Sequence, residues 1–159
     1  MQPKHFVAFD LGATSGRTIL GSLRDGELVL KELTRFPNTI LPLGGHYYWN
    51  IFSLYEHLCE GLRAAAREGV EIASVGIDTW GVDFVLVDAR GRLVGDAVAY
   101  RDARTNDVAA DVDAGIGLER LYRVTGIQRQ AFNTVYQLAA LSREHPEELE
   151  AADRFLMVP

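Results

Sequence analysis

The sequence has a single cysteine and no long apolar run, and each of these shortages excludes a class of protein. Cys59 alone cannot form an intramolecular disulfide, and it lies in a helical pattern where a small buried hydrophobic residue is expected. No apolar run approaches the roughly 18 residues of a transmembrane helix, and residues 1–5 lead into a strand without a signal-peptide core. These features predict a cytoplasmic protein without membrane contact.

Positive charge is also in short supply, because 16 Lys and Arg stand against 22 Asp and Glu, for a formal net charge of −6. Nucleic-acid binding needs a stripe of basic side chains, whereas lysine is scarce here and the arginines are scattered. The four histidines show no metal-ligand spacing, and one cysteine cannot build a thiolate site. We therefore expect neither a nucleic-acid partner nor a zinc site.

The composition is that of one globular domain, in which strands come first and helices follow. With 159 residues, 48% of them hydrophobic, the chain can bury roughly 70% of its unfolded surface. Apolar runs predict strands over 6–10, 17–23 and 28–36, with Asp25-Gly26 as a hairpin turn, and a loop over 37–45. Later strands are expected over 73–78, 82–88, 93–94 and 155–158, the first of them buried and reached by a crossover.

Helices are predicted from apolar residues that recur every three or four positions and from their capping signals. The first helix starts at Asn50 or at a capping box from Ser53 to Glu56, and Gly69 follows its end. Further helices are expected over 101–112, 118–125 and 134–144, and a last one has Pro146 as its first residue. Alternating strands and helices predict an α/β fold.

The segment Asp-Leu-Gly-Ala-Thr-Ser-Gly-Arg, from Asp10 to Arg17, joins the first two predicted strands. Its small residues, hydroxyls and accessible backbone N–H groups could fold around a phosphate, and a carboxylate at a strand end suits Mg²⁺. It lacks the spacing and lysine of a Walker loop and is not a nucleophile elbow. The alternative is that the same residues form an ordinary turn between two strands, with Gly12 and Gly16 at positive φ and Arg17 in solvent.

A second string, Gly-Ile-Asp-Thr-Trp-Gly-Val-Asp-Phe over 76–84, places polar groups inside an apolar strand. Because burying such groups is costly, we expect a binding role, with Trp80 as an apolar face and Gly81 admitting a ligand to the backbone. A bulge with Trp80 in the core is the alternative. Arg101, Asp102 and Arg104 could form a salt-bridged helix cap or a polar wall.

These strings, together with Tyr-Arg-Asp-Ala-Arg-Thr over 100–105, Gly-Ile-Gln over 126–128 and Phe-Asn-Thr over 132–134, resemble the FGGY carbohydrate kinases of the actin and sugar-kinase superfamily. The resemblance runs from Phe6 to Pro159. It implies that residues 1–159 form the N-terminal domain, a ribonuclease-H-like α/β domain with a mixed sheet flanked by helices. It also implies a second, C-terminal domain that carries the general base, so no catalytic residue is assigned here.

The resemblance further implies ATP and Mg²⁺ as cofactors and a ketose as substrate. It places Mg²⁺ at Asp10 and the ATP phosphates at Ala13, Thr14, Ser15, Gly16 and Arg17. It places the sugar at Asp78, Thr79, Trp80, Gly81, Arg101, Asp102, Phe132 and Asn133.

The string over 78–83 is most similar to family members that act on L-rhamnulose, which implies phosphorylation of its 1-hydroxyl. Glycerol kinases carry arginine and glutamate at the positions of Gly81 and Val82, so the small pair here implies a bulkier substrate. A kinase of fuculose or xylulose and a non-catalytic sugar-responsive regulator are the alternatives. The expected partners are the ketose, ATP and the protein's own C-terminal domain.

Overall fold

The computed structural model describes residues 3–158, which form two compact units. The sheet unit contains residues 3–40 and 50–81, and the helical unit contains residues 41–49 and 82–158. Each unit has a hydrophobic core of its own.

The sheet unit is a four-stranded mixed sheet in the order β3-β2-β1-β6. Its strands are β1 (Lys4–Leu11), β2 (Ser15–Arg24), β3 (Glu27–Pro37) and β6 (Ile72–Thr79). The first three are antiparallel, with Asp25 and Gly26 at positive φ in the second turn, and β6 runs parallel to β1. The predicted meander, hairpin and crossover are thereby confirmed.

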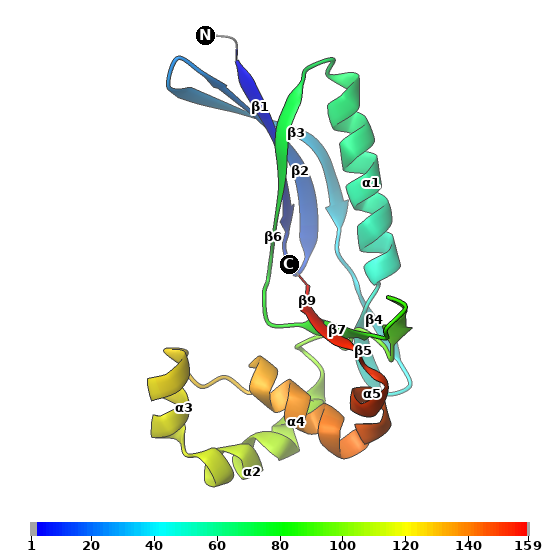
Figure 1. Cartoon of the computed structure of the whole chain (residues 1–159), viewed down its shortest axis with the longest axis vertical. Helices are drawn as coiled ribbons and strands as arrows, with labels where there is room; N and C mark the ends of the chain where they lie inside the picture. Colours follow the sequence, from blue (N-terminus) through cyan, green and yellow to red (C-terminus); the bar gives the residue numbers. More distant parts are fainter. Residues whose placement is uncertain (1–2, 159) are drawn as a thin grey trace. The chain divides into compact units, whose positions relative to one another are not determined.

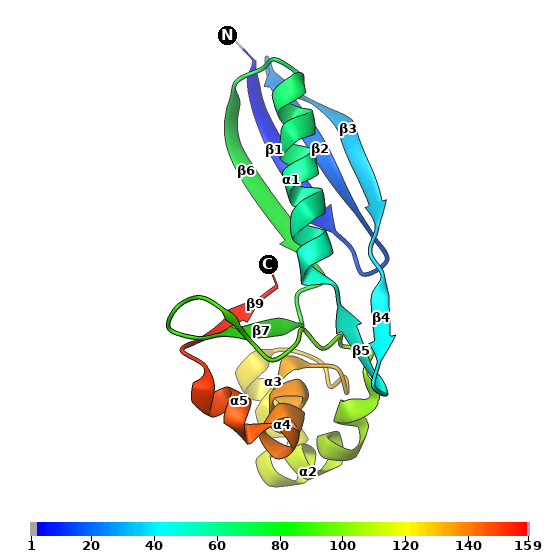
Figure 2. The same ribbon diagram turned by 90° about the vertical axis from the view of Figure 1, so that its right-hand side faces the viewer.

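Helix α1 (Ile51–Arg67) makes the crossover and covers one face of the sheet (Figure 2). Asn50 caps it, because its side-chain oxygen accepts a hydrogen bond from the Ser53 amide at 3.1 Å. Of the two predicted starts, the one at Asn50 is therefore confirmed.

The core of this unit forms between alternate residues of the strands and α1. Its buried members are Val7, Phe9, Leu11, Leu20, Phe36, Leu54 and Ala65. Side chains alternate between the two faces along a strand. Asp10, between the buried Phe9 and Leu11, and Arg17, which pairs with it on β2, therefore point to the face opposite this core. The prediction that residues 73–78 are buried is wrong: within the described residues β6 is an edge strand, and Val75 is 50% exposed.

Two short strands, β4 (Ile40–Leu43) and β5 (His46–Trp49), pair with each other at the start of the helical unit. The loop predicted over 37–45 is therefore wrong over 40–43. Pro37, Asn38 and the pair Gly44-Gly45 suggested a loop, but the glycines form the turn between the strands. A three-stranded antiparallel sheet follows, in the order β8-β7-β9, from β7 (Phe84–Val87), β8 (Leu93–Val94) and β9 (Arg154–Met157).

Four helices complete this unit (Figure 1): α2 (Asn106–Ile116), α3 (Leu118–Thr125), α4 (Thr134–Glu144) and α5 (Pro146–Ala151). The predicted helix over 101–112 begins too early, because Asp102 caps a 3₁₀ turn at Ala103–Thr105 that precedes α2. Phe84, Leu86 and Leu141 form the buried core cluster between β7 and α4. Among the helices of the described part, none has the length and hydropathy to span a membrane.

Candidate functional site

The loop between β1 and β2 is held from outside by Asn38, just beyond the end of β3. The Asn38 side-chain amide donates to the carbonyl of Gly12 at 2.9 Å, and its backbone N–H donates to the carbonyl of Thr14 at 3.0 Å. The Gly12 amide donates to the Ser15 carbonyl at 2.9 Å. Asn38 thus donates a hydrogen bond to each of two loop carbonyl oxygens, whose partial negative charges would otherwise repel a phosphate. The sequence offered no local signal for this role of Asn38.

Gly16 is required by space rather than by backbone conformation. Gly12 and Gly16 do not adopt positive φ, which removes the ordinary-turn explanation for these glycines. A Cβ atom on Gly16 would lie 2.6 Å from Cε2 of Phe36, which is 4% exposed. The Phe36 ring in turn stacks on His57 of α1, with centroids 4.1 Å apart and an interplanar angle of 9°. The exit of the loop therefore rests directly on a fixed aromatic stack.

Asp10 and Arg17 face each other across β1 and β2. The Nε and Nη2 atoms of Arg17 lie 2.7 and 2.6 Å from Oδ2 of Asp10. Asp78 is the partner of Asp10 on the neighbouring strand β6, so the three charged residues lie side by side on the face opposite α1.

These residues fit a Mg²⁺ ion that keeps most of its waters. Such an ion takes one or two protein carboxylates together with phosphate oxygens. Both Arg17 contacts reach Oδ2 of Asp10, which leaves Oδ1 as the oxygen for a cation. Residues 3–158 hold no cluster of three or more His, Cys, Asp or Glu that could enclose a metal.

The segment after β6 turns at Gly81, whose backbone is open. Gly81 has a φ of +84°, and a Cβ atom built on it meets nothing within 4 Å. Its amide donates to Oγ1 of Thr79 at 3.2 Å. Trp80 is partly buried and packs against the core of the sheet unit, which is the alternative considered for it. Gly81 thus has open space beside its backbone, as its proposed sugar contact requires.

In the helical unit, the predicted sugar residues surround two aromatic rings. Tyr100 and Phe132 meet edge to face with centroids 5.5 Å apart, and Phe132 is 36% exposed. Arg101 lies over the Tyr100 ring and its Nε donates to the Tyr100 hydroxyl at 3.1 Å. Asn133 precedes α4 and donates its side-chain amide to the Gln128 carbonyl at 2.9 Å. The result is a surface with aromatic and polar groups.

Asp102 is buried and acts as a cap. It accepts hydrogen bonds from the amides of Tyr47 at 2.8 Å and Arg104 at 2.9 Å, and from His46 at 3.2 Å. Burial raises the pKa of its carboxyl, but these hydrogen bonds outweigh burial and hold the pKa below its ordinary value. Asp102 therefore caps the 3₁₀ turn before α2 through hydrogen bonds accepted from backbone amides, and not through an ion pair with Arg101 or Arg104.

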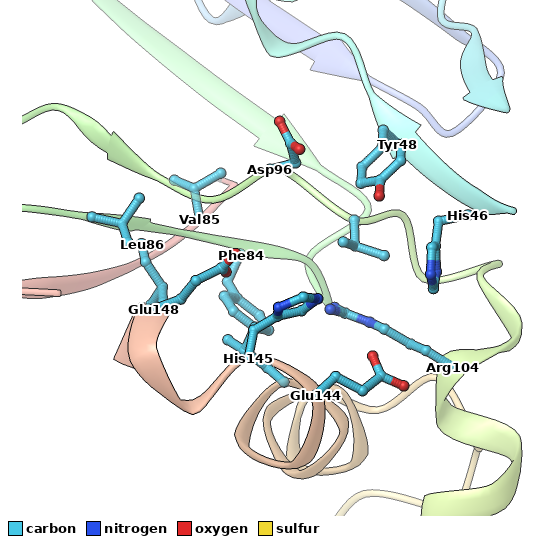
Figure 3. Close-up of a pocket in the computed structure, with 13 residues that line it drawn as sticks. His46, Tyr48, Phe84, Val85, Leu86, Asp96, Arg104, Glu144, His145 and Glu148 are labelled. Atoms are coloured by element: carbon cyan, nitrogen blue, oxygen red, sulfur yellow. The ribbon is translucent and has the colours of Figure 1, made fainter. Parts of the chain in front are cut away.

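A separate cavity of about 220 Å³ lies in the helical unit (Figure 3). Arg104, Glu144 and His145 converge on it, and burial lowers the pKa of the Arg104 guanidinium. None of the residues assigned to the sugar from the sequence lines this cavity.

The structure brings the predicted residues together in two groups, one in each unit. Asp10, the loop over 13–17, Asp78, Thr79, Trp80 and Gly81 belong to the sheet unit. Arg101, Asp102, Phe132 and Asn133 belong to the helical unit.

The fold of this chain is shared with a solved sugar kinase. The structure is similar to gluconate kinase from Lactobacillus acidophilus, with a TM-score of 0.81 at 14% identity, covering 98% of this chain and 31% of that one. That kinase therefore has the same fold over the matched part of its chain.

The family follows from the sequence comparisons. Residues 5–159 match the model of the N-terminal domain of the FGGY family of carbohydrate kinases, and the chain belongs to this family. It is 49% identical over 156 residues to rhamnulokinase from Bacteroides thetaiotaomicron, which covers 98% of this chain and 32% of that protein. It is 46% identical over 153 residues to rhamnulokinase from Oceanobacillus iheyensis, which covers 96% of this chain and 33% of that protein. The chain spans about a third of the length of these relatives.

Proposed function

We propose that this chain is the N-terminal domain of an ATP-dependent kinase that transfers the γ-phosphoryl group of ATP to the 1-hydroxyl of L-rhamnulose. The observation that carries the proposal is the loop over 12–17, held open by Asn38, beside the Asp10 carboxylate. The similarity to rhamnulokinases over nearly the whole chain supports L-rhamnulose as the ketose.

Phosphoryl transfer needs positioning and charge neutralisation more than covalent help from the protein. The loop over 13–16 supplies backbone N–H groups and the hydroxyls of Thr14 and Ser15 to the ATP phosphates. Arg17 adds a positive charge at the exit of the loop, and Asp10 would hold the Mg²⁺ ion. When bound, Mg²⁺ neutralises charge on the phosphates.

The sugar residues orient the attacking hydroxyl. In this proposal Gly81 of the sheet unit, with Asp78 and Thr79 before it, contacts the ketose. The family resemblance also assigns Arg101, Phe132 and Asn133 of the helical unit to the sugar. The 1-hydroxyl oxygen forms a bond to the γ-phosphorus as the bond to the leaving ADP breaks. The hydroxyl proton passes to a base that the family resemblance locates in the C-terminal domain.

The test is a steady-state assay of the complete protein with ATP, Mg²⁺ and three ketoses: L-rhamnulose, L-fuculose and D-xylulose. We expect kcat/KM for L-rhamnulose to exceed the other two by a factor of about 10 or more, which is about 1.4 kcal/mol of discrimination. A preference for L-fuculose or D-xylulose would assign the alternative substrate. Sugar binding without turnover of any of the three would favour the regulator.

A further inference from the structure

A fully buried carboxylate joins the segments that carry the aromatic surface. Asp83 is 0% exposed. Its Oδ2 accepts hydrogen bonds from Nε1 of Trp49 at 2.5 Å and from the backbone amide of Tyr100 at 3.2 Å. Its Oδ1 accepts a hydrogen bond from Nε2 of Gln137 at 2.8 Å. A buried charge is costly unless such donors satisfy it, so these donors account for its stability in this position.

Gln137 extends this network to Phe132. It is 1% exposed, and its Nε2 also donates to the backbone carbonyl of Phe132 at 3.0 Å. Its Oε1 accepts from Nη2 of Arg104 at 3.2 Å, which fixes the orientation of the Gln137 amide. The carboxylate therefore holds the backbone of Tyr100 directly and that of Phe132 through one side chain.

We propose that Asp83 is a positioning residue for the sugar: it keeps the Tyr100 and Phe132 rings in their edge-to-face arrangement and does not itself touch the substrate. This inference rests on the proposed function, because it treats that aromatic surface as a sugar contact. Asp83 reaches the segments of two predicted sugar residues: it accepts from the amide of Tyr100, which precedes Arg101, and from Gln137, which also donates to the carbonyl of Phe132.

The chemistry of the three donors makes the carboxylate specific. Trp49, Tyr100 and Gln137 each direct an N–H group at Asp83, so only a group that accepts at both oxygens satisfies them. An asparagine has the same shape but would direct its NH₂ group at one of these donors. Asp83→Asn is therefore a small change in volume and a large change in hydrogen bonding.

The experiment uses the complete protein, with Asp83→Asn compared against Asp113→Asn. Asp113 is a matched control in the same unit, since it accepts hydrogen bonds from Tyr136 at 2.6 Å and Arg129 at 2.8 Å and makes no contact with Tyr100 or Phe132. We expect Asp83→Asn to raise KM for L-rhamnulose at least about tenfold while KM for ATP stays within about twofold. Asp113→Asn should leave both constants within about twofold.

Hydrogen exchange gives a readout that does not depend on turnover. In Asp83→Asn, the NH₂ group faces either the Gln137 side chain or the Tyr100 amide, so exchange in at least one of the peptides over 97–104 and 130–138 should accelerate at least about tenfold. In Asp113→Asn, exchange over 97–104 should not change. If Asp83→Asn does not fold, Gln137→Met tests the link from Asp83 to Phe132 through Gln137. We expect KM for the sugar to rise about fivefold or more and KM for ATP to stay unchanged. Equal losses for sugar and ATP, or an unchanged sugar KM in a folded Asp83→Asn, overturn the inference.

The two proposals fail in different ways. Wild-type protein that phosphorylates no ketose refutes the proposed function. In that case, unchanged exchange over both 97–104 and 130–138 in Asp83→Asn refutes the positioning role as well. An active wild-type enzyme with an unaffected Asp83→Asn variant refutes only the positioning role.

Discussion

The substitution Gly16→Ala tests whether the phosphate loop depends on its contact with Phe36. A methyl group on Gly16 would lie 2.6 Å from Cε2 and 3.0 Å from Cε1 of the Phe36 ring, well inside van der Waals contact. The ring cannot easily retreat, because it is buried and stacked on His57 at 4.1 Å. The simplest relief is a displacement of the loop itself, which carries the groups proposed to contact ATP.

The size of the effect follows from the cost of overpacking. An extra methyl group in a well-packed site costs about 1–3 kcal/mol. Because about 1.4 kcal/mol is tenfold in an equilibrium constant, the Kd for ATP should rise about 5- to 150-fold if displacement of the loop absorbs the strain. Phe36→Leu, which shortens the ring side chain, should restore a large part of that affinity in the double variant.

The assay is calorimetric titration of the complete protein with ATP and Mg²⁺, with a thermal scan of each variant. Gly76→Ala is the control, since a Cβ on Gly76 meets nothing within 4 Å and its φ is not positive. We expect its Kd to stay within about twofold of wild type. The reasoning is refuted if Gly16→Ala binds ATP normally, or if Phe36→Leu gives no recovery in a folded double variant.

Four further predictions concern the metal, the loop, the sugar and the loss of stability at acidic pH. Asp10→Asn should lower kcat about 100-fold or more by weakening the Mg²⁺ contact, and turnover within about threefold at saturating Mg²⁺ would make Asp10 a purely structural partner of Arg17. Asn38→Asp should raise the Kd for ATP about tenfold, because an oxygen would face the Gly12 carbonyl; exposed Asn106→Asp is the control, and equal Kd values would show that the clamp is dispensable. Gly81→Arg should abolish turnover of L-rhamnulose and leave ATP affinity unchanged, whereas Gly81→Ala, with the same strain at a φ of +84°, should retain most activity; normal turnover by the arginine variant contradicts the assignment. The hydrogen-bonded Asp102 has a lowered pKa, so its contribution to stability is present above the ordinary carboxyl pKa of about 3.9 and is lost as pH falls through the folded-state pKa. In urea unfolding from pH 7 to 3, the free energy of unfolding should therefore fall less steeply with decreasing pH in Asp102→Asn than in wild type. Equal pH dependence of the two proteins would refute this.

Elements bounded by strong local signals could be predicted from the sequence. The helices Leu118–Thr125 and Thr134–Glu144 were predicted to the residue; the first lies between Gly117 and Gly126, which end helical geometry on either side. The cap at Asn50 and the hairpin at Asp25-Gly26 were local for the same reason. Elements that depend on a distant partner were missed, as with β4, whose neighbouring proline, asparagine and glycines looked like a loop until β5 paired with it.

The sequence by itself determined the fold class and the family, because the residues and the order of its motif segments are local and specific. Only the tertiary structure decided how those segments are held. Asn38 meets Gly12 across 26 positions, Trp49 meets Asp83 across 34, and Gln137 meets Asp83 across 54. Side-chain hydrogen bonds and aromatic stacking over such separations follow no periodic pattern along the chain. They exist only once the strands and helices have packed and brought the donors and acceptors into one place.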